Sequence, residues 1–125
     1  MHSKLIKILF ISSIAALAFP AIAVAGDAAA GKALFEVNCG TCHGMAGKGD
    51  GPLAAALNPK PRDLSAGVFN FDTDGDGTKG SDADLKNVIT KGALVYGGSA
   101  MMAPVQGLSD ADQDNLVAFI RSLKQ

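Results

Sequence analysis

The run Cys39-Gly40-Thr41-Cys42-His43 constrains this chain more than any other feature, because it places two thiols and an imidazole within one helical turn. Residues 39, 42 and 43 are related as i, i+3 and i+4, so on a helix their side chains face the same side. Two sulfurs at this spacing can form thioether bonds with the two vinyl groups of a haem, and the next imidazole then reaches the iron. The run predicts covalent attachment of one haem c through Cys39 and Cys42, with His43 as an axial ligand of the iron.

Two other interpretations of the cysteine pair fit the chain less well. A redox-active disulfide of the thioredoxin type expects a βαβ setting, and no segment here has a strand pattern. A zinc site needs more thiolate or imidazole ligands than this chain offers, because beyond His2 the sequence contains one histidine, His43. A thiol oxidoreductase would also be colourless, which separates it from a haem protein by eye.

The first residues predict a secretory signal peptide. A basic start is followed by an apolar run over residues 8–19 and by the small residues Ala23 and Ala25, which suit a cleavage site. The expected division is a signal peptide at 1–25 and one domain at 26–125, exported to the periplasm. An uncleaved anchor is the alternative, but a run of about 12 apolar residues is shorter than the roughly 20 that span a bilayer. Membrane contact is therefore expected only through a partner or an uncleaved signal.

Charge and cysteine content exclude two classes of protein. The chain has 11 basic and 12 acidic residues, and removal of Lys4 and Lys7 with the signal leaves 9 against 12, a formal charge of −3. Such an acidic balance makes nucleic acid an unexpected partner. Only two cysteines, close together, cannot form a disulfide-rich scaffold.

Capping residues and apolar periodicity predict an all-α domain. Ser81 with Asp84, and Ser109 with Asp112, have the spacing of capping boxes that begin helices. Glycines and prolines punctuate the rest of the chain and favour loops. The expected elements are helices at 27–38 and 82–91, a last helix after Ser109, a short helical turn at 52–57, and loops at 44–51, 58–63, 72–80 and 93–107.

The second axial ligand is expected to be a methionine. His43 is the only histidine of the expected mature chain, which excludes two histidine ligands from this chain. Methionine commonly lies opposite histidine in electron-transfer haem proteins. Met45 is too close to His43 in sequence to reach the other face, so Met101 and Met102 are the candidates.

The expected mature region resembles the class I cytochromes c over essentially its whole length. The segments that carry the resemblance are GKALFEVNCGTCHG for the first helix and haem site, GDGP and NPKPRD for the following loops, and GGSAMMAP with LSDADQDNLVAFIRSL for the methionine loop and last helix. The resemblance implies the small cytochrome c fold, with three main helices and long loops around one covalently bound haem.

Individual roles follow from the same resemblance. Gly31 and Phe35 are similar to the first-helix residues that cross the last helix, here near Phe119. Pro52 is similar to the proline whose carbonyl accepts a hydrogen bond from the histidine ligand, His43, and so orients its imidazole.

The methionine loop departs from the family pattern. Family members often have methionine directly followed by proline, whereas this chain has Met101, Met102, Ala103 and Pro104. Both methionines stay open as ligands, and Met102 is favoured because it is nearer to Pro104.

Three further features have a functional and a structural interpretation. Arg62 could pair with a haem propionate or be solvated, and Tyr96 could donate to a propionate or pack at the edge of the cofactor. The run Asp72 to Gly77 matches the first half of an EF-hand calcium loop, but Ala83 stands where the loop needs a bidentate glutamate. A tight acidic turn before Ser81 is the alternative to a calcium site.

Both axial positions of the iron would then be filled, so the expected function is electron transfer between redox partner proteins, with no enzyme activity and no small-molecule substrate. One alternative is a cytochrome c subunit of a larger oxidoreductase complex. Another is a haem sensor or enzyme with an open sixth position.

Overall fold

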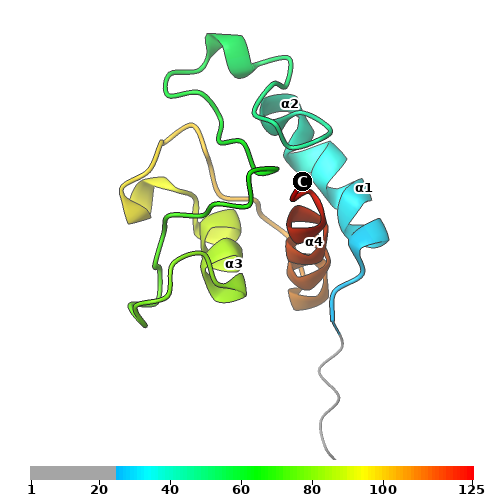
Figure 1. Cartoon of the computed structure of the whole chain (residues 1–125), viewed down its shortest axis with the longest axis vertical. Coiled ribbons are helices and arrows are strands. Elements are labelled where there is room, and N and C mark those ends of the chain that lie inside the picture. Colours follow the sequence, from blue (N-terminus) through cyan, green and yellow to red (C-terminus); the bar gives the residue numbers. More distant parts are fainter. Residues whose placement is uncertain (1–24) are drawn as a thin grey trace, which may run out of the picture.

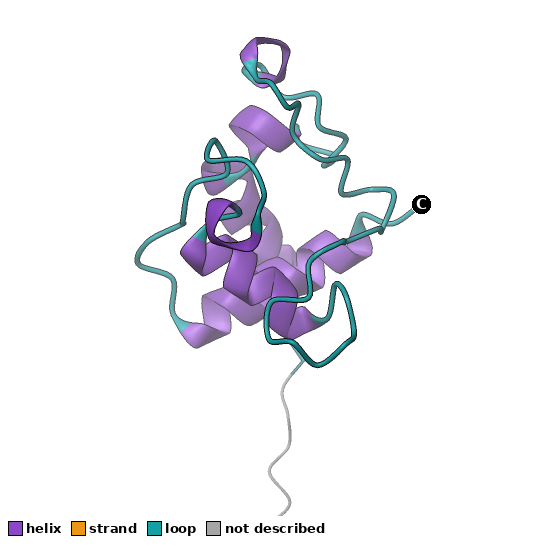
Figure 2. Cartoon of the chain, turned by 90° about the vertical axis from the view of Figure 1, so that its left-hand side faces the viewer, coloured by secondary structure: helices purple, strands orange, loops and turns teal. Residues whose placement is uncertain are grey.

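Residues 25–125 are described by a computed structural model, in which helices are joined by long loops (Figure 1). Along the chain the elements are α1 (Ala28–Asn38), α2 (Gly40–His43), the 3-10 helix η1 (Ala54–Ala56), α3 (Asp82–Lys91), the 3-10 helix η2 (Leu94–Tyr96) and α4 (Asp110–Ser122). Residues 25–125 contain no strand, as Figure 2 shows. The predicted all-α fold with three main helices and long loops is confirmed.

The predicted helix starts are confirmed by their caps. The Asp27 carboxylate accepts from the first backbone N–H groups of α1. Capping boxes begin α3, where Ser81 pairs with Asp84, and α4, where Ser109 pairs with Asp112. These reciprocal bonds satisfy N–H groups that have no partner within the helix.

Two short elements differ from the sequence-based expectation. The helical turn expected at 52–57 is the 3-10 helix η1, which is shorter, and the loop expected at 93–107 contains η2. Local patterns predict such single turns poorly, because one turn of helix needs few residues of any particular type.

Helix α1 crosses α4 at a point where both helices bury aromatic rings. Phe35 of α1 is fully buried and lies 5.1 Å, centroid to centroid, from Phe119 of α4. Gly31, one turn earlier, has no side chain, and a Cβ there would overlap the backbone carbonyl of Asn115. The small residue lets the two backbones approach closely, which confirms the predicted crossing of Gly31 and Phe35 near Phe119.

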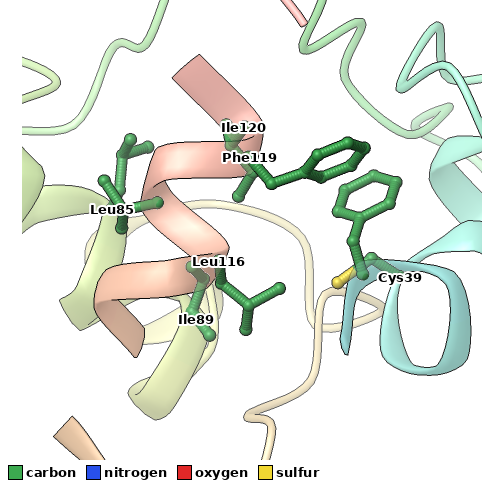
Figure 3. Packing of buried hydrophobic residues seen from close by; sticks show 8 residues of the cluster. Cys39, Leu85, Ile89, Leu116, Phe119 and Ile120 are labelled. Carbon is green, nitrogen blue, oxygen red and sulfur yellow. The ribbon is translucent and has the colours of Figure 1, made fainter. Parts of the chain in front are cut away.

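Helix α3 packs on another side of α4. Figure 3 shows Leu85 and Ile89 of α3 beside α4, whose Leu116 and Ile120 belong to the same buried cluster. The same buried cluster reaches Cys39 at the end of α1. The core therefore extends to Cys39, the first residue of the CxxCH run, and fixes its position.

Arg121 joins the C-terminal part of α4 to the loop before α3. Its guanidinium donates to the Asp82 carboxylate and to the Gly80 carbonyl, and lies 5.2 Å from the centroid of the Phe69 ring. Phe69, Gly80 and the first residue of α3 are thereby attached to α4.

The predicted signal peptide at 1–25 lies outside the described residues, except for Ala25. From residue 25 onward, no helix has the length and apolar character needed to cross a membrane.

Candidate haem-binding site

The CxxCH run forms a single helical turn directly after α1. The backbone N–H of His43 donates to the Cys39 carbonyl at 2.9 Å, and the N–H of Cys42 donates to the same oxygen at 3.2 Å. These bonds close the turn, so the two thiols and the imidazole are spaced as i, i+3 and i+4 on one helical surface. Cys39, Cys42 and His43 are therefore brought together as the sequence predicts.

The two thiols lie in different surroundings. Cys39 is 8% exposed and belongs to the apolar core, whereas Cys42 is half-buried. Burial, and to a lesser extent the neighbouring Cys42, raises the pKa of the Cys39 thiol to about 11. The core thus holds Cys39 as a neutral thiol at neutral pH, at a fixed place beside the Phe35 and Phe119 rings.

The imidazole of His43 is held by a backbone carbonyl. Its Nδ1 lies 3.0 Å from the carbonyl oxygen of Arg62. Because a carbonyl only accepts, Nδ1 carries the proton and donates, and the Nε2 lone pair is left for a metal. Burial lowers the pKa of His43, while the bond to Arg62 acts in the opposite direction. Both the neutral state and the tautomer suit an iron ligand.

The expected role of Pro52 is corrected by this bond. The resemblance assigns the accepting carbonyl to Pro52, but the carbonyl at Nδ1 belongs to Arg62. Pro52 is exposed and lines a separate cavity of about 320 Å³ with Gly40 and Thr41. The Pro61 carbonyl comes so close to Gly49 that a Cβ there would overlap it, and this approach brings Arg62 to His43.

Met45 lies beside α2, as its closeness to His43 in the sequence predicts. A Cβ on Gly40 would lie 3.0 Å from the Met45 sulfur. The Met45 sulfur is therefore next to the CxxCH turn itself, a position that does not suit a ligand from the opposite face of a haem.

The two candidate methionines lie in the segment after η2. Figure 1 shows this yellow and orange segment beyond α3, whereas α2 continues from the upper end of α1. The Met102 carbonyl accepts from Ala93 N–H at 3.0 Å, and Val105 N–H donates to the Ile89 carbonyl at 2.8 Å, so the segment is tied to the end of α3. Met102 is half-buried and Met101 is 60% exposed.

Arg62 and Tyr96 are placed by the fold in different ways. The Arg62 side chain is exposed, and its backbone carbonyl makes the contact with His43. The half-buried ring of Tyr96 lies 6.4 Å from the ring of Phe71. Contact of either residue with a propionate stays a prediction.

In the turn formed by residues 72–77, carboxylates accept hydrogen bonds from backbone N–H groups of the same turn. Asp72 accepts from the backbone N–H groups of Gly75 and Gly77, and Asp74 accepts from that of Asp76. Carboxylate oxygens of Asp72, Asp74 and Asp84 come within 4.8 Å of one another. Asp84, however, already accepts four hydrogen bonds from Thr73 and Ser81, which gives it a structural role in fixing this turn to α3.

Comparison with known proteins agrees with this arrangement. Residues 28–124 match the family model of cytochrome c. The chain belongs to the cytochrome c family.

One relative is cytochrome c-554(547) of Halothiobacillus neapolitanus, to which the chain is 40% identical over 103 residues, covering 80% of this chain and 100% of that protein. A solved structure, the reducing HAO-like protein complex of Kuenenia stuttgartiensis, superimposes with a TM-score of 0.65 at 28% identity. That match covers 81% of this chain, which spans only 44% of the matched chain.

Membership of this family establishes a covalently bound c-type haem with its iron as the cofactor, and electron transfer as the class of function. The donors present in the structure fit that group, because the CxxCH turn offers two thiols and an imidazole whose Nδ1 is already occupied. The exposed apolar side chains of Leu94, Val95 and Met101 also suit an apolar macrocycle. The recognition of the family and the prediction of haem c are confirmed.

Proposed function

We propose that this chain is a periplasmic electron carrier with one haem, attached through Cys39 and Cys42 and ligated by His43 and Met102. The observation that carries the proposal is the His43 imidazole, on the turn that bears both thiols. Its Nδ1–H is bound by the Arg62 carbonyl at 3.0 Å, and its Nε2 has no hydrogen-bond partner among residues 25–125. The hydrogen bond at Nδ1 orients the imidazole, so that Nε2 is positioned to bind a metal.

Attachment needs no oxidant or reductant. In each thioether, the sulfur bonds to one carbon of a vinyl group and the thiol hydrogen goes to the other carbon, so no atom is lost. The buried core fixes Cys39, and the hydrogen bond from the Cys42 N–H to the Cys39 carbonyl fixes Cys42 relative to it. The distance between the two sulfurs is therefore restricted. The rigid pair would hold one edge of the haem.

Support for Met102 as the second ligand comes from its backbone. The Met102 carbonyl accepts a hydrogen bond from the Ala93 N–H, just after α3, and the Met102 N–H donates to the Ser99 carbonyl. These two bonds fix the backbone of Met102. Met101 is attached through its N–H to the Ser99 hydroxyl and is the alternative ligand. A thioether from either residue favours Fe(II) and raises the reduction potential.

With two protein ligands, the iron has no position for a substrate, which is why we propose a carrier and not an enzyme. The bound haem supplies a one-electron Fe(III)/Fe(II) couple. The chain's part is to orient His43 through Arg62, to exclude water with apolar side chains and to keep both oxidation states similar in structure. Its partners are redox proteins, one that donates and one that accepts the electron.

Absorption spectra test this ligation. The haem-loaded wild type is compared with Met101→Ala and Met102→Ala in the oxidised and reduced states. We expect the weak far-red band of methionine-bound ferric iron to disappear in Met102→Ala alone. Its disappearance only in Met101→Ala would transfer the role to Met101.

Carbon monoxide separates the carrier from a haem sensor or enzyme. A reduced wild-type protein that keeps methionine on its iron should not bind carbon monoxide readily at neutral pH. Ready binding, together with no far-red band, would refute the carrier and favour an open sixth position.

A second candidate function is a haem subunit of a larger oxidoreductase. The observation that favours it is the structural similarity to one chain of a protein complex, in which the matched chain is more than twice as long as the matched region. Co-purification of this chain with a larger partner in a fixed ratio would support the subunit, whereas a freely diffusing monomer supports the carrier.

The periplasmic location rests on the basic, apolar and small-residue order of residues 1–25. The N-terminal sequence of the haem-loaded protein tests it directly. A mature chain beginning at Gly26, recovered from the periplasmic fraction, is the expected result, and a retained Met1 in the membrane fraction would contradict it.

A further inference from the structure

Residues 61–65 cross the glycine-rich loop that follows His43. The Leu64 N–H donates to the Gly47 carbonyl at 2.6 Å. Gly47 and Gly49 have φ of 68° and 73°, a left-handed conformation that suits glycine, and a Cβ on Gly49 would overlap the Pro61 carbonyl. This close crossing brings the next carbonyl, that of Arg62, within 3.0 Å of His43 Nδ1.

A side-chain turn begins immediately after that carbonyl. The Asp63 carboxylate accepts from the Ser65 backbone N–H at 2.9 Å and from the Ser65 hydroxyl at 2.6 Å. The Ser65 hydroxyl bond is the largest cause that lowers the pKa of Asp63, so the carboxylate is ionised at neutral pH. Since Asp63 N and the Arg62 carbonyl share one peptide plane, the turn fixes the direction of that carbonyl.

The turn is also attached to the end of the chain. The Gln125 N–H donates to the Ser65 carbonyl at 3.3 Å, and Ser65 is itself buried. A carbonyl placed by a loop crossing on one side and by a buried turn on the other has little freedom to move away from His43.

We propose that Asp63 and Ser65 are positioning residues for the histidine ligand. Their turn holds the Arg62 carbonyl against Nδ1–H, fixes the plane of the imidazole and sets how strongly it donates to iron. The inference rests on the proposed role of His43 as the axial ligand.

The direct measurement is hydrogen exchange of the His43 Nδ1–H, followed by proton NMR in the reduced, haem-loaded protein. Asp63→Ala removes the acceptor of both hydrogen bonds of the turn. We expect exchange to be about tenfold faster, because two hydrogen bonds are lost. Ser65→Ala keeps the carboxylate and the backbone bond, so about threefold is expected.

The amide variant separates the turn from the charge. Asp63→Asn removes the negative charge but keeps an oxygen that can accept from Ser65, so exchange should stay close to that of the wild type. The matched control is Asp76→Ala, which removes an acidic side chain that accepts from the N–H two residues on, that of Thr78, in a different loop. This control should leave the exchange unchanged.

The reduction potential gives a second readout in Ser65→Ala, because this variant leaves the charge of Asp63 in place. A looser Nδ1 bond weakens imidazole donation and stabilises Fe(III) less, so the potential should rise. If Asp63→Ala does not accumulate with haem, Ser65→Ala and Asp63→Asn still decide the question.

Each outcome has one meaning. Unchanged exchange in Asp63→Ala, or equal acceleration in Asp63→Asn and Asp63→Ala, overturns the positioning role. If the spectrum still shows histidine bound to the iron, the proposed function stays intact. A wild-type spectrum without histidine ligation overturns both. Fast exchange in Asp63→Ala with wild-type exchange in Asp63→Asn is the expected result.

Discussion

The Phe35 ring lies 5.1 Å from the Phe119 ring, with the two planes inclined at 57°, where α1 crosses α4. Tilted ring pairs at this separation are favourable beyond the apolar area they bury. Cys39 belongs to the same buried cluster, at the end of α1. The helix crossing therefore also fixes Cys39, the proposed first attachment point of the haem.

Phe35→Ala should destabilise the haem-loaded protein by about 3–5 kcal/mol, because it removes a fully buried ring and leaves a cavity. The measurement is the free energy of unfolding in guanidinium chloride. Val37→Ala is the control on the same helix, since Val37 is 80% exposed, and its effect should stay within about 0.5 kcal/mol. Equal losses in the two variants would mean that the crossing does not carry the stability of the domain.

Gly31→Ala tests the close approach of the two helices. Alanine in place of glycine usually stabilises a helix by about 1 kcal/mol. Here the added Cβ would overlap the Asn115 carbonyl, and a backbone atom cannot move aside, so we expect a loss of about 1–3 kcal/mol instead. The control is Gly40→Ala, whose Cβ would lie 3.0 Å from the Met45 sulfur, in an exposed side chain that can move, and at an ordinary contact distance of 3.8 Å from the Phe35 carbonyl oxygen. A stabilised Gly31→Ala variant would show that the helices can separate without loss of stability.

Local sequence chemistry predicts the helix starts and the attachment turn well. Ser81 with Asp84 and Ser109 with Asp112 are spaced for reciprocal bonds, and those bonds depend on residues within one turn. The same holds for Cys39, Cys42 and His43, whose grouping follows from helical spacing alone.

The partner of His43 could not be predicted in this way. Its acceptor is a backbone carbonyl 19 residues away, at Arg62, and a carbonyl has no signature in the sequence. The glycines that permit the crossing, Gly47 and Gly49, are recognisable as loop residues, but their spacing does not say which segment comes close. The choice of Pro52 is wrong because it follows a family pattern and not a contact.

Asp84 should make the stability of the protein depend on pH. Hydrogen bonds from Thr73, and then from Ser81, hold the pKa of this carboxyl well below its ordinary value of 3.8. A carboxylate with a lowered pKa in the folded state stabilises that state above pH 3.8, and the contribution is lost as pH falls below it. The difference in unfolding free energy between the wild type and Asp84→Asn should be largest near neutral pH and shrink in acid.

Asp76→Asn is the control for this pH dependence. Asp76 is exposed and its carboxylate accepts from the Thr78 backbone N–H, so its substitution removes one negative charge from the same loop and weakens one exposed hydrogen bond. The shrinking difference should be absent from this variant. A difference for Asp84→Asn that stays constant from neutral pH to about pH 3 would show that the Thr73 and Ser81 bonds do not favour the ionised form.

Gly92→Ala should displace Met102, the proposed second ligand, without a change to Met102 itself. Gly92 ends α3 with φ of 79°, and a Cβ there would lie 3.0 Å from both the Met102 carbonyl oxygen and Pro104 Cδ. The residue would be strained, and the segment that carries Met102 would have to shift away from α3. We expect the far-red band of the ferric protein to weaken while the haem stays attached.

Gly107→Ala separates this displacement from backbone strain. Gly107 has a similar φ of 77°, but a Cβ there would have no atom within 4 Å. It should lose stability through strain alone and keep the far-red band. Loss of the band in both variants would mean that backbone strain loosens the whole domain. Loss in Gly92→Ala alone would show that the end of α3 fixes the position of Met102, the proposed second ligand.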